Sequence, residues 1–531
     1  GDDGGIGPVE DYPPFCARVS TQTINPRYAF TGDTRLVETA KRMQAAGFDS
    51  IKIQADLPNG PNGYCLDALS PPASSPADLL ARDPSYQYVL NANFNTYSIW
   101  INAAVNWGDG LSVSEQTTAY TRMYQAACYL LTNYQNTSKT FLLGNWEGDW
   151  LLKGQAGPSC SQPPEPSQTR IQGMIDWLNT RADGVIDART DCGGPGVNAL
   201  SYAEVNCVPA AMSGLPRMTN EVLPEIHVDA ISYSAYDVQG GGDLGQMKQN
   251  ITAALDFIRL NATGAAKDYI YIGEYGFPYN ESGWDAPARE LRTAAMFEAA
   301  AGWGCQHVLW WQVFDNECEC SGAPCTCNQT PDSCRGFWLI DNSNNTVAVY
   351  DMHREYISKA HVFKNLYRWY LKRNPDQPAL NSFGGTFRTF NPSLRLNAFI
   401  NSAEYHNLIT DADYVTLLFQ DLLMRDPGPA EITTYTGMAR PTALEDVMNG
   451  VEAQSVVSNE QFIDHLYDNM LGRAASAAER SARLSQLQNT PRSTLWREVL
   501  NSQEFRLREL NIRNRNQHGD IVIKRKYWFD Y

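Results

Sequence analysis

Residues 269–276, YIYIGEYG, join a short apolar run to a glutamate, and they decide the fold expected for the first two thirds of the chain. The aromatic and β-branched residues before Gly273 are typical of a buried β-strand. A helical segment follows from about Pro287 to Gly302, with proline early and glycine late, as helix ends favour. The next apolar run, HVLWWQV at 307–313, reads as another strand. A strand, a helix and a further strand in this order indicate a parallel βαβ unit.

The same alternation extends back to the start of the chain. Strands are expected near residues 28–30, 50–54, 97–105, 140–144, 199–205, 228–234, 269–273 and 307–313. Right-handed crossovers between them leave a closed barrel or a doubly wound sheet. No glycine-rich phosphate loop follows the first strand, which disfavours nucleotide binding. We therefore expect an α/β fold, a (β/α)₈ TIM barrel over residues 1–371, followed by a small all-α helical domain.

Cysteines and glycosylation sequons indicate a secreted protein. The chain has 12 cysteines, none of them after Cys334, and an even count is typical of disulfides in an oxidising compartment. N-x-S/T sequons, which are predicted glycosylation sites, begin at Asn136, Asn250, Asn261, Asn280, Asn328 and Asn344. The chain opens with Gly1 and lacks an apolar leader, so we expect that a signal peptide has been removed. No apolar run is long enough for a membrane span, and the expected location is extracellular.

A cluster of cysteines follows the last expected strand. It comprises Cys318, Cys320, Cys325, Cys327 and Cys334. Paired C-x-C motifs can bind zinc, but beside sequons a disulfide-stapled loop at the rim of a cleft is favoured. Cys305 is a candidate sixth partner, and the pairing cannot be derived from the sequence. The seven histidines show no metal-ligand spacing, so neither a metal nor a cofactor is expected.

Three glutamates end expected strands: Glu147, Glu204 and Glu274. Reactive groups of a (β/α)₈ barrel lie at these strand ends, and glycoside hydrolysis requires two carboxyl groups. The fourth and seventh strands lie on opposite sides of the barrel axis, so Glu147 and Glu274 are the predicted catalytic pair. Glu204 is expected to line the cleft or to form a salt bridge. Strand-end aromatic residues, suited to binding sugar rings, are Trp100, Trp146, Trp150, Tyr233, Trp310 and Trp311.

These residues resemble the clan of retaining (β/α)₈ glycoside hydrolases, which place an acid/base glutamate after strand four and a nucleophile after strand seven. The resemblance implies that Glu274 is the nucleophile, that Tyr233 donates a hydrogen bond to it, and that Trp310 or Trp311 forms the floor of a sugar subsite. The clan has asparagine directly before its acid/base glutamate, whereas Trp146 separates Asn145 from Glu147 here. One of these two side chains is therefore expected to leave the cleft. Neighbours on a strand face opposite sides, so one of the paired tryptophans should face the cleft and the other pack under the helices.

The C-terminal third has a different composition, without cysteines or sequons. Residues 372–394, rich in proline and glycine, are expected to form a linker, residues 395–515 a helical repeat domain and residues 516–531 a tail. Similar segments begin at Ser402, Ser458 and Ser502, and residues 414–425 align with 462–473. Two such units packed face to face would bury a shared core. The basic tail reads as a solvated end, with a docking strand at 521–523 as the alternative.

The repeats resemble a bacterial family known as a domain of unknown function, found on extracellular and surface-layer proteins. That resemblance implies an attachment or assembly module.

Two functions follow from the sequence. The first is a secreted hydrolase of β-linked polysaccharide or oligosaccharide, with Asn145, Trp146, Trp150, Glu204, Tyr233, Trp310 and Trp311 as expected substrate-binding residues. The second is an inert extracellular structural or surface-layer protein, assembled through the helical domain. A formal net charge of −17 argues against a general nucleic-acid binder, because neutralising phosphates requires clustered lysine and arginine.

Overall fold

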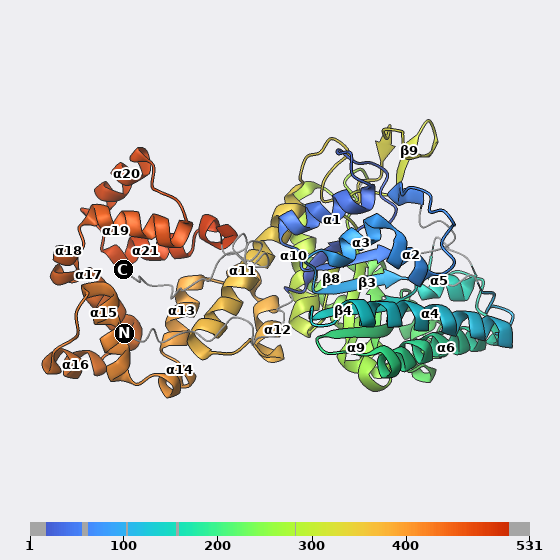
Figure 1. Ribbon diagram of the computed structural model, residues 1–531, viewed down its shortest axis with the longest axis horizontal. Coiled ribbons are helices and arrows are strands. Elements are labelled where there is room, and N and C mark those ends of the chain that lie inside the picture. Colours follow the sequence, from blue (N-terminus) through green and yellow to red (C-terminus); the bar gives the residue numbers. More distant parts are fainter. Residues whose placement is uncertain (1–16, 56–61, 102–104, 155–158, 282, 509–531) are drawn as a thin grey trace. The chain divides into compact units, whose positions relative to one another are not determined.

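The computed structural model describes residues 17–55, 62–101, 105–154, 159–281 and 283–508 (Figure 1). The described residues divide into two compact units. The barrel unit comprises residues 17–354 and 377–386, and the helical unit comprises residues 355–376 and 387–508. Cys16 and the expected tail at 516–531, with its alternative docking strand, lie outside the described residues.

The barrel unit is a closed (β/α)₈ TIM barrel in which eight parallel strands pair in sequence order and the last pairs with the first. The strands are β1 (Val19–Gln22), β2 (Ser50–Gln54), β3 (Thr96–Trp100), β4 (Lys139–Gly144), β5 (Val197–Val205), β6 (Ala230–Ser234), β7 (Ile270–Tyr275) and β8 (Val308–Trp310). Seven of them lie where the sequence predicts.

The prediction of the first strand is wrong. Strand β1 precedes residues 28–30, where Tyr28 and Phe30 instead pack their rings against Phe314. Its sequence, VSTQ, alternates with Ser20 and Gln22 and so lacks the apolar run of the other strands. Tyr28 and Phe30 resemble the apolar residues of a buried strand more closely than β1 does, so the sequence pattern places the first strand in the loop after β1.

Helices cover the outside of the barrel (Figure 1). The helices of this unit before α11 are α1 (Arg35–Ala46), α2 (Pro76–Arg82), α3 (Pro84–Asn91), α4 (Val113–Asn133), α5 (Gly148–Lys153), α6 (Gln168–Cys192), α7 (Val208–Met212), α8 (Tyr236–Gln239), α9 (Leu244–Asn261) and α10 (Ala286–Trp303), and the short α5, α7 and α8 contribute residues to the cleft described below. Local signals set their ends: Ser112 and Glu115 form a capping box at the start of α4. Gly47, with a φ of 89°, ends α1 in the left-handed region that suits glycine.

The expected linker at 372–394 contains a helix of the barrel unit. Helix α12 (Gln377–Gly385) packs against α10, and the backbones approach so closely that a Cβ on Gly384 would lie 2.6 Å from the Cβ of Ala301. Helix α11 (Ala348–Leu371) begins in the barrel unit and continues into the helical unit. Glycines and prolines in this segment predict a linker. Gly384 and Gly385 instead allow α12 to pack closely against α10.

The cysteine-rich loop is stapled by disulfides, as predicted. Strands β9 (Cys318–Cys320), β10 (Ala323–Pro324) and β11 (Ser333–Cys334) form a small antiparallel sheet within it. The five disulfides of the barrel unit are Cys65–Cys327, Cys128–Cys192, Cys160–Cys207, Cys318–Cys334 and Cys320–Cys325. Cys305 is not a sixth partner of the loop: it is a buried free thiol.

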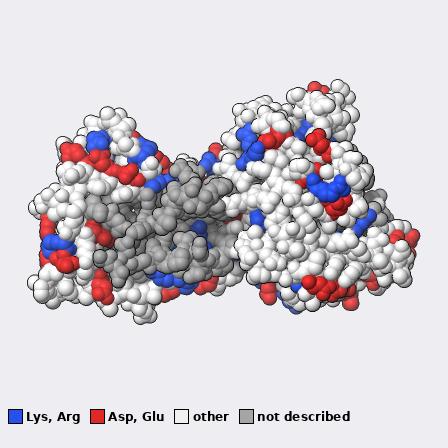
Figure 2. Space-filling model, in the orientation of Figure 1, with Lys and Arg blue, Asp and Glu red and all other residues white. Residues whose placement is uncertain are grey.

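The helical unit consists of short helices around one apolar core that includes Leu396, Leu444 and Trp496. After α11 they are α13 (Pro392–Ile400), α14 (Ala403–Leu408), α15 (Asp411–Leu423), α16 (Pro429–Thr436), α17 (Arg440–Asn449), α18 (Val451–Val456), α19 (Asn459–His465), a π-helix (Leu466–Leu471), α20 (Ala477–Leu487) and α21 (Arg492–Leu500). Figure 2 shows basic residues interspersed with acidic ones on the visible face of the described chain.

No helix in the described part of the chain combines the length and apolar character that crossing a membrane requires. Among the asparagines of the six sequons, four are exposed and two are half-buried, so none is enclosed in the core. The exposed ones are Asn136, Asn280, Asn328 and Asn344, and the half-buried ones are Asn250 and Asn261.

Candidate active site

A cleft of about 1070 Å³ lies at the C-terminal ends of the barrel strands, where the loops after the strands converge. Its volume is at the upper end of the range that binding sites occupy, and it exceeds what one sugar ring fills. The aromatic residues that line it are Trp100, Trp146, Trp150, Tyr236, Trp284, Trp311 and Phe337. Glu147 and Glu274 both line it, so the predicted catalytic pair shares one cleft.

The chain accommodates Trp146 by turning at the end of β4. Trp146 and Glu147 both line the cleft, and Glu147 directly precedes α5. Asn145 is the residue that leaves: it is fully buried, does not line the cleft, and its side-chain amide donates a hydrogen bond to the carbonyl of Trp146. The expected role of Asn145 at the substrate is therefore absent from this geometry.

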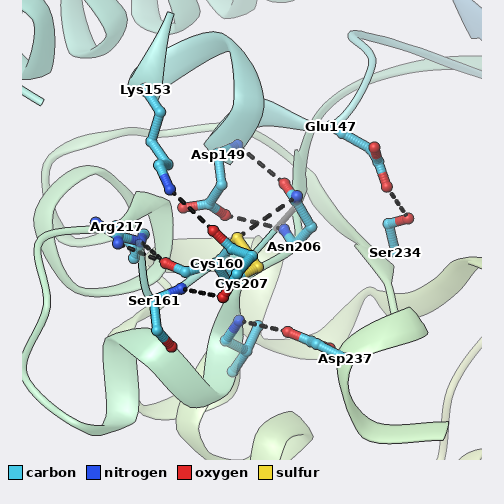
Figure 3. Close-up of a disulfide and its surroundings, with 12 residues drawn as sticks. Glu147, Asp149, Lys153, Cys160, Ser161, Asn206, Cys207, Arg217, Ser234 and Asp237 are labelled. Carbon is cyan, nitrogen blue, oxygen red and sulfur yellow. Dashed lines mark hydrogen bonds between the residues drawn. A yellow bond between two sulfur atoms is a disulfide. The ribbon is translucent and has the colours of Figure 1, made fainter. Parts of the chain in front are cut away.

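Ser234, at the end of β6, joins the two carboxylates. Its hydroxyl lies 2.5 Å from Oε1 of Glu147 and 3.4 Å from Oε2 of Glu274. The two carboxylate oxygens are therefore no more than about 6 Å apart. Figure 3 shows the side chains of Glu147 and Ser234 directed toward each other.

Lys52 and Glu204 form a buried ion pair beneath this bridge. Lys52, on β2, places Nζ 2.9 Å from Oε2 of Glu204 and 3.0 Å from Oε1 of Glu274, and its side chain is fully enclosed. Glu204 accepts two further hydrogen bonds, from the hydroxyl of Ser232 at 2.7 Å and from the backbone N–H of Glu147 at 3.0 Å. Glu204 is thus salt-bridged and 0% exposed, and it does not line the cleft.

Gly273 allows strands β6 and β7 to approach each other closely beneath the cleft. A Cβ at this position of β7 would lie 1.8 Å from Oγ of Ser232, a distance that no packing tolerates. The glycine before Glu274 in the YIYIGEYG segment is therefore required by the close approach of β6 and β7. Its carbonyl also accepts a hydrogen bond from Lys52.

The two cleft carboxyls differ in their surroundings. Burial raises the pKa of Glu147 well above its usual value, and the charge of Glu274 raises it further, against one hydrogen bond from Ser234. Burial also raises the pKa of Glu274, to about 7, but Lys52 opposes the rise. Burial would lower the pKa of Lys52, yet Glu204 and Glu274 together hold it above its usual value. Glu147 is therefore the carboxyl that retains a proton more readily.

The hydrogen bond that the resemblance assigns to Tyr233 is made by Tyr236. Tyr233 points out of the barrel, is fully buried and donates to Asp237. Tyr236, the first residue of α8, lines the cleft and places its hydroxyl 3.3 Å from Oε2 of Glu274. Ser232 and Ser234 point inward from β6, so Tyr233 between them must point outward.

The paired tryptophans of the β8 segment divide as expected. Trp311 lines the cleft, with its ring 6.2 Å from that of Trp100 between centroids. Trp310 packs away from the cleft against Tyr275 and His353. Among the remaining expected substrate-binding residues, Trp146 and Trp150 line the cleft.

A disulfide forms part of the wall beside Glu147 (Figure 3). Cys160 and Cys207 join the loop after α5 to the end of β5. Asp149 fixes the neighbouring backbone, since its carboxylate accepts hydrogen bonds from the N–H groups of Asn206 and Met218. Burial raises the pKa of Asp149 to about 7. The disulfide and this carboxylate therefore hold the two loops in place.

Sequence reasoning missed Lys52, Ser232, Ser234 and Tyr236. A signal was available for Lys52, because a lysine inside the strand SIKIQ is unusual in a buried barrel. The serines gave no such signal, since serine is common in strands and loops alike.

Comparisons with known proteins give the following likenesses. Residues 444–508 match a family described as a domain of unknown function, DUF4214. The structure is similar to GH5_18 from Streptomyces cattleya in complex with GlcNAc, with 13% identity and a TM-score of 0.42, covering 72% of this chain and 92% of that one. It is also similar to a mutant of the glycoside hydrolase 5 lichenase from Caldicellulosiruptor sp. F32 in complex with cellotetraose, with 12% identity and a TM-score of 0.41, covering 67% and 96%.

A third similar structure is the GH5-4 broad-specificity endoglucanase from Bacteroides salanitronis, with 13% identity and a TM-score of 0.39, covering 65% of this chain and 93% of that one. A search of curated protein sequences finds no match.

Proposed function

We propose that the barrel unit is a secreted glycoside hydrolase that cleaves β-linked polysaccharide or oligosaccharide with retention of configuration. Glu147 is the acid/base and Glu274 the nucleophile. The observation that carries the proposal is the pair of cleft carboxyls joined through Ser234 but supplied with unequal donors. Glu274 contacts the Lys52 cation and the hydroxyl of Tyr236, with the Ser234 hydroxyl 3.4 Å away, whereas the Glu147 carboxyl pairs with the same Ser234 hydroxyl at 2.5 Å.

The spacing of the carboxyls supports retention. Retaining enzymes hold their two carboxyl groups ~5–5.5 Å apart, and inverting enzymes hold them ~6.5–9.5 Å apart to admit a water molecule. Because Ser234 limits one oxygen pair of the two glutamates to about 6 Å, the carboxyl groups can adopt the retaining spacing.

The reaction proceeds in two steps. Glu147 donates its proton to the glycosidic oxygen while a carboxylate oxygen of Glu274 bonds to the anomeric carbon, and the glycosidic C–O bond breaks. The leaving alcohol departs and a glycosyl ester of Glu274 remains. Glu147, now ionised, then takes a proton from water, whose oxygen bonds to the anomeric carbon and releases Glu274.

The cleft supports a carbohydrate substrate. Tryptophan faces bind the apolar C–H faces of sugar rings, and Trp100, Trp146 and Trp311 line the cleft beside the carboxyls. The charged lining is mostly acidic, and its one described cation, Arg335, is already paired with Glu281 and Glu317. Such a lining favours uncharged sugars over uronic acids.

The proposal also includes an extracellular location for the protein and an attachment or assembly role for the helical unit. Five disulfides suit an extracellular protein, and the exposed sequons suit glycosylation. The helical unit would serve attachment or self-assembly. Sedimentation of the full chain tests this: a concentration-dependent oligomer supports self-assembly, and a monomer at all concentrations leaves attachment to another surface.

The alternative of an inert structural barrel is less well supported. Burying carboxyl groups costs stability, and a scaffold without catalysis gains nothing from two of them in one cleft. Neither hypothesis relies on a metal or a cofactor.

The experiment that tests the proposal is hydrolysis of a panel of β-glucans, mannan and xylan by the full chain and by Glu274→Gln. We expect the variant to lose at least about a thousandfold in kcat, and proton NMR of the wild-type reaction to show the retained anomer first. Glu225→Gln, an exposed glutamate away from the cleft, is the matched control. Activity retained by Glu274→Gln, or an inverted first product, overturns the mechanism.

A second variant separates the two roles. Glu147→Ala should still form the glycosyl ester from an aryl β-glycoside, because an activated leaving group needs no acid. Azide should then accelerate turnover and give the β-glycosyl azide. An α-azide would instead identify Glu147 as the nucleophile and reverse the assignment.

A further inference from the structure

The buried pair of Lys52 and Glu204 contacts the catalytic site without being exposed to it. Both side chains are fully enclosed, and neither lines the cleft. An ion pair inside a barrel is costly, because desolvation offsets much of the attraction. The interior of a (β/α)₈ barrel is ordinarily filled by branched apolar side chains, which would pack here without that cost. The pair therefore needs an explanation beyond stability.

Its geometry points to Glu274. Nζ of Lys52 lies between the two carboxylates, 2.9 Å from Glu204 and 3.0 Å from Glu274, and over the ring of Trp100 at 4.4 Å. Glu204 is surrounded by donors alone, namely Lys52, the Ser232 hydroxyl and the Glu147 N–H. The positive charge of Lys52 is therefore shared between two carboxylates. The negative charge of Glu204 weakens the electrostatic attraction between Lys52 and Glu274.

We infer that Lys52 and Glu204 are positioning residues that set the ionisation of the nucleophile: Lys52 holds Glu274 ionised, and Glu204 limits how strongly it does so. The inference rests on the proposed function for its catalytic meaning. Within the described residues, the titratable groups facing Glu274 are Lys52 from β2, Glu147 after β4, Tyr202 and Glu204 from β5, and Tyr236 after β6.

Opposite effects of two substitutions follow from this arrangement. Lys52→Met removes the cation at nearly constant length, so Glu274 loses its attraction and its pKa rises. Glu204→Gln removes the competing carboxylate, so Lys52 acts on Glu274 alone and the pKa of Glu274 falls. An opposite charge at this distance shifts a carboxyl pKa by about one unit or more.

The test is the acid limb of the pH profile of kcat/KM for the full chain. We expect it to move to higher pH in Lys52→Met, to lower pH in Glu204→Gln, and to lie between the two in the double variant. Asp229→Asn is the matched control: it breaks an ion pair with Arg189 elsewhere in the barrel, and should lower stability without moving the limb. Shifts in the same direction in both single variants, or no shift, overturn the inference.

A readout without turnover separates this inference from the proposed function. Infrared difference spectra across a pH titration report the carboxyl band that disappears in Glu274→Gln. The same opposite shifts of that band support the pair's role even if the panel shows no hydrolysis, in which case only the proposed function fails. An unmoved band in both variants removes the role itself.

Discussion

At the scale of single residues, the cleft needs one ionised and one protonated carboxyl at the same pH. Burial raises the pKa of Glu274 to about 7 and that of Glu147 well above its usual value. Activity requires Glu274 without its proton and Glu147 with it, so kcat/KM should fall below about pH 7 and fall again at high pH. A pH profile on any polymer that the enzyme cleaves tests this. An optimum near pH 4 to 5 contradicts it, because Glu274 would then be ionised far below the expected value.

Two tyrosines three residues apart provide a matched pair of substitutions. Tyr236→Phe removes a hydrogen bond to Glu274, and hydrogen bonds to charged groups contribute about 1.5–3 kcal/mol, so kcat/KM should fall roughly 10- to 100-fold. Tyr233→Phe removes a hydrogen bond to Asp237 and should lower stability more than activity. Steady-state kinetics with thermal unfolding of both variants decides. Equal activity losses would remove the special role of Tyr236.

How far the sequence predicts the site depends on where each side chain points. Glu147 and Glu274 were predictable because strand ends converge in a barrel, a rule that needs only strand positions. Tyr233 was not, since its direction depends on the parity of β6, whose register against β7 shifts between Tyr233 and Ser234. Lys52 was missed because its meaning comes from two carboxylates more than a hundred residues away, which no local pattern connects to it.

At the scale of elements, the helical unit contains three repeats where the sequence indicated two. In each repeat, an arginine stacks on an aromatic ring that lies six residues earlier in the sequence. The pairs are Arg373 on Tyr367, Arg425 on Phe419 and Arg473 on Tyr467. Each arginine also pairs with a later glutamate, which is Glu404, Glu452 and Glu504 in turn. The alignment of 414–425 with 462–473 has this spacing. The three serines of the sequence comparison do not occupy the same position in the repeat. Ser402 and Ser502 lie just before the paired glutamate, whereas Ser458, like Thr410, lies after it and caps the next helix.

The first repeat escaped prediction because its arginine lies just after the end of α11, a helix that begins in the barrel unit. The repeats form a closed set: α13, α17 and α21 each contact the other two. The amide oxygen of Asn449 accepts from the N–H of Ser493, and that of Asn501 from the N–H of Ser393. This arrangement differs from two units packed face to face.

Closure predicts cooperative loss of the helical unit. Trp496 is fully buried in the shared core, so Trp496→Ala should destabilise the unit by roughly 3–5 kcal/mol. In a linear stack the effect would stay near the third repeat, whereas in a closed set all three should lose protection together. Hydrogen exchange read by mass spectrometry distinguishes these outcomes. The control is Val451→Ala, at a side chain that is 86% exposed, and protection lost only in residues 459–508 would contradict closure.

At the scale of the whole molecule, the barrel unit contains several carboxyls whose pKa values are raised by desolvation. They are Asp83, Glu147, Asp149, Asp237, Glu274 and Asp315. A carboxyl with a folded pKa above its unfolded value stabilises the fold below the unfolded pKa, and this contribution is lost as the pH rises through the folded pKa. Two buried histidines, His307 and His353, act in the opposite direction, because burial lowers their pKa values to about 3 and about 4.

The balance of these groups predicts how stability depends on pH. The two histidines increase stability as the pH rises, but only up to about pH 6.5, the usual histidine pKa. The carboxyls of Asp149 and Glu274 lose their protons in the folded protein near pH 7, so their stabilising contribution is lost there. Thermal unfolding of the barrel unit, followed by near-ultraviolet circular dichroism, should therefore show a midpoint that falls between about pH 5.5 and about pH 8. Asp237→Asn removes one contributing carboxyl and should make the fall smaller. A midpoint that rises over this window would mean that the cleft carboxyls are ionised in the folded protein at little cost, and it would remove the basis for a protonated Glu147 near neutral pH.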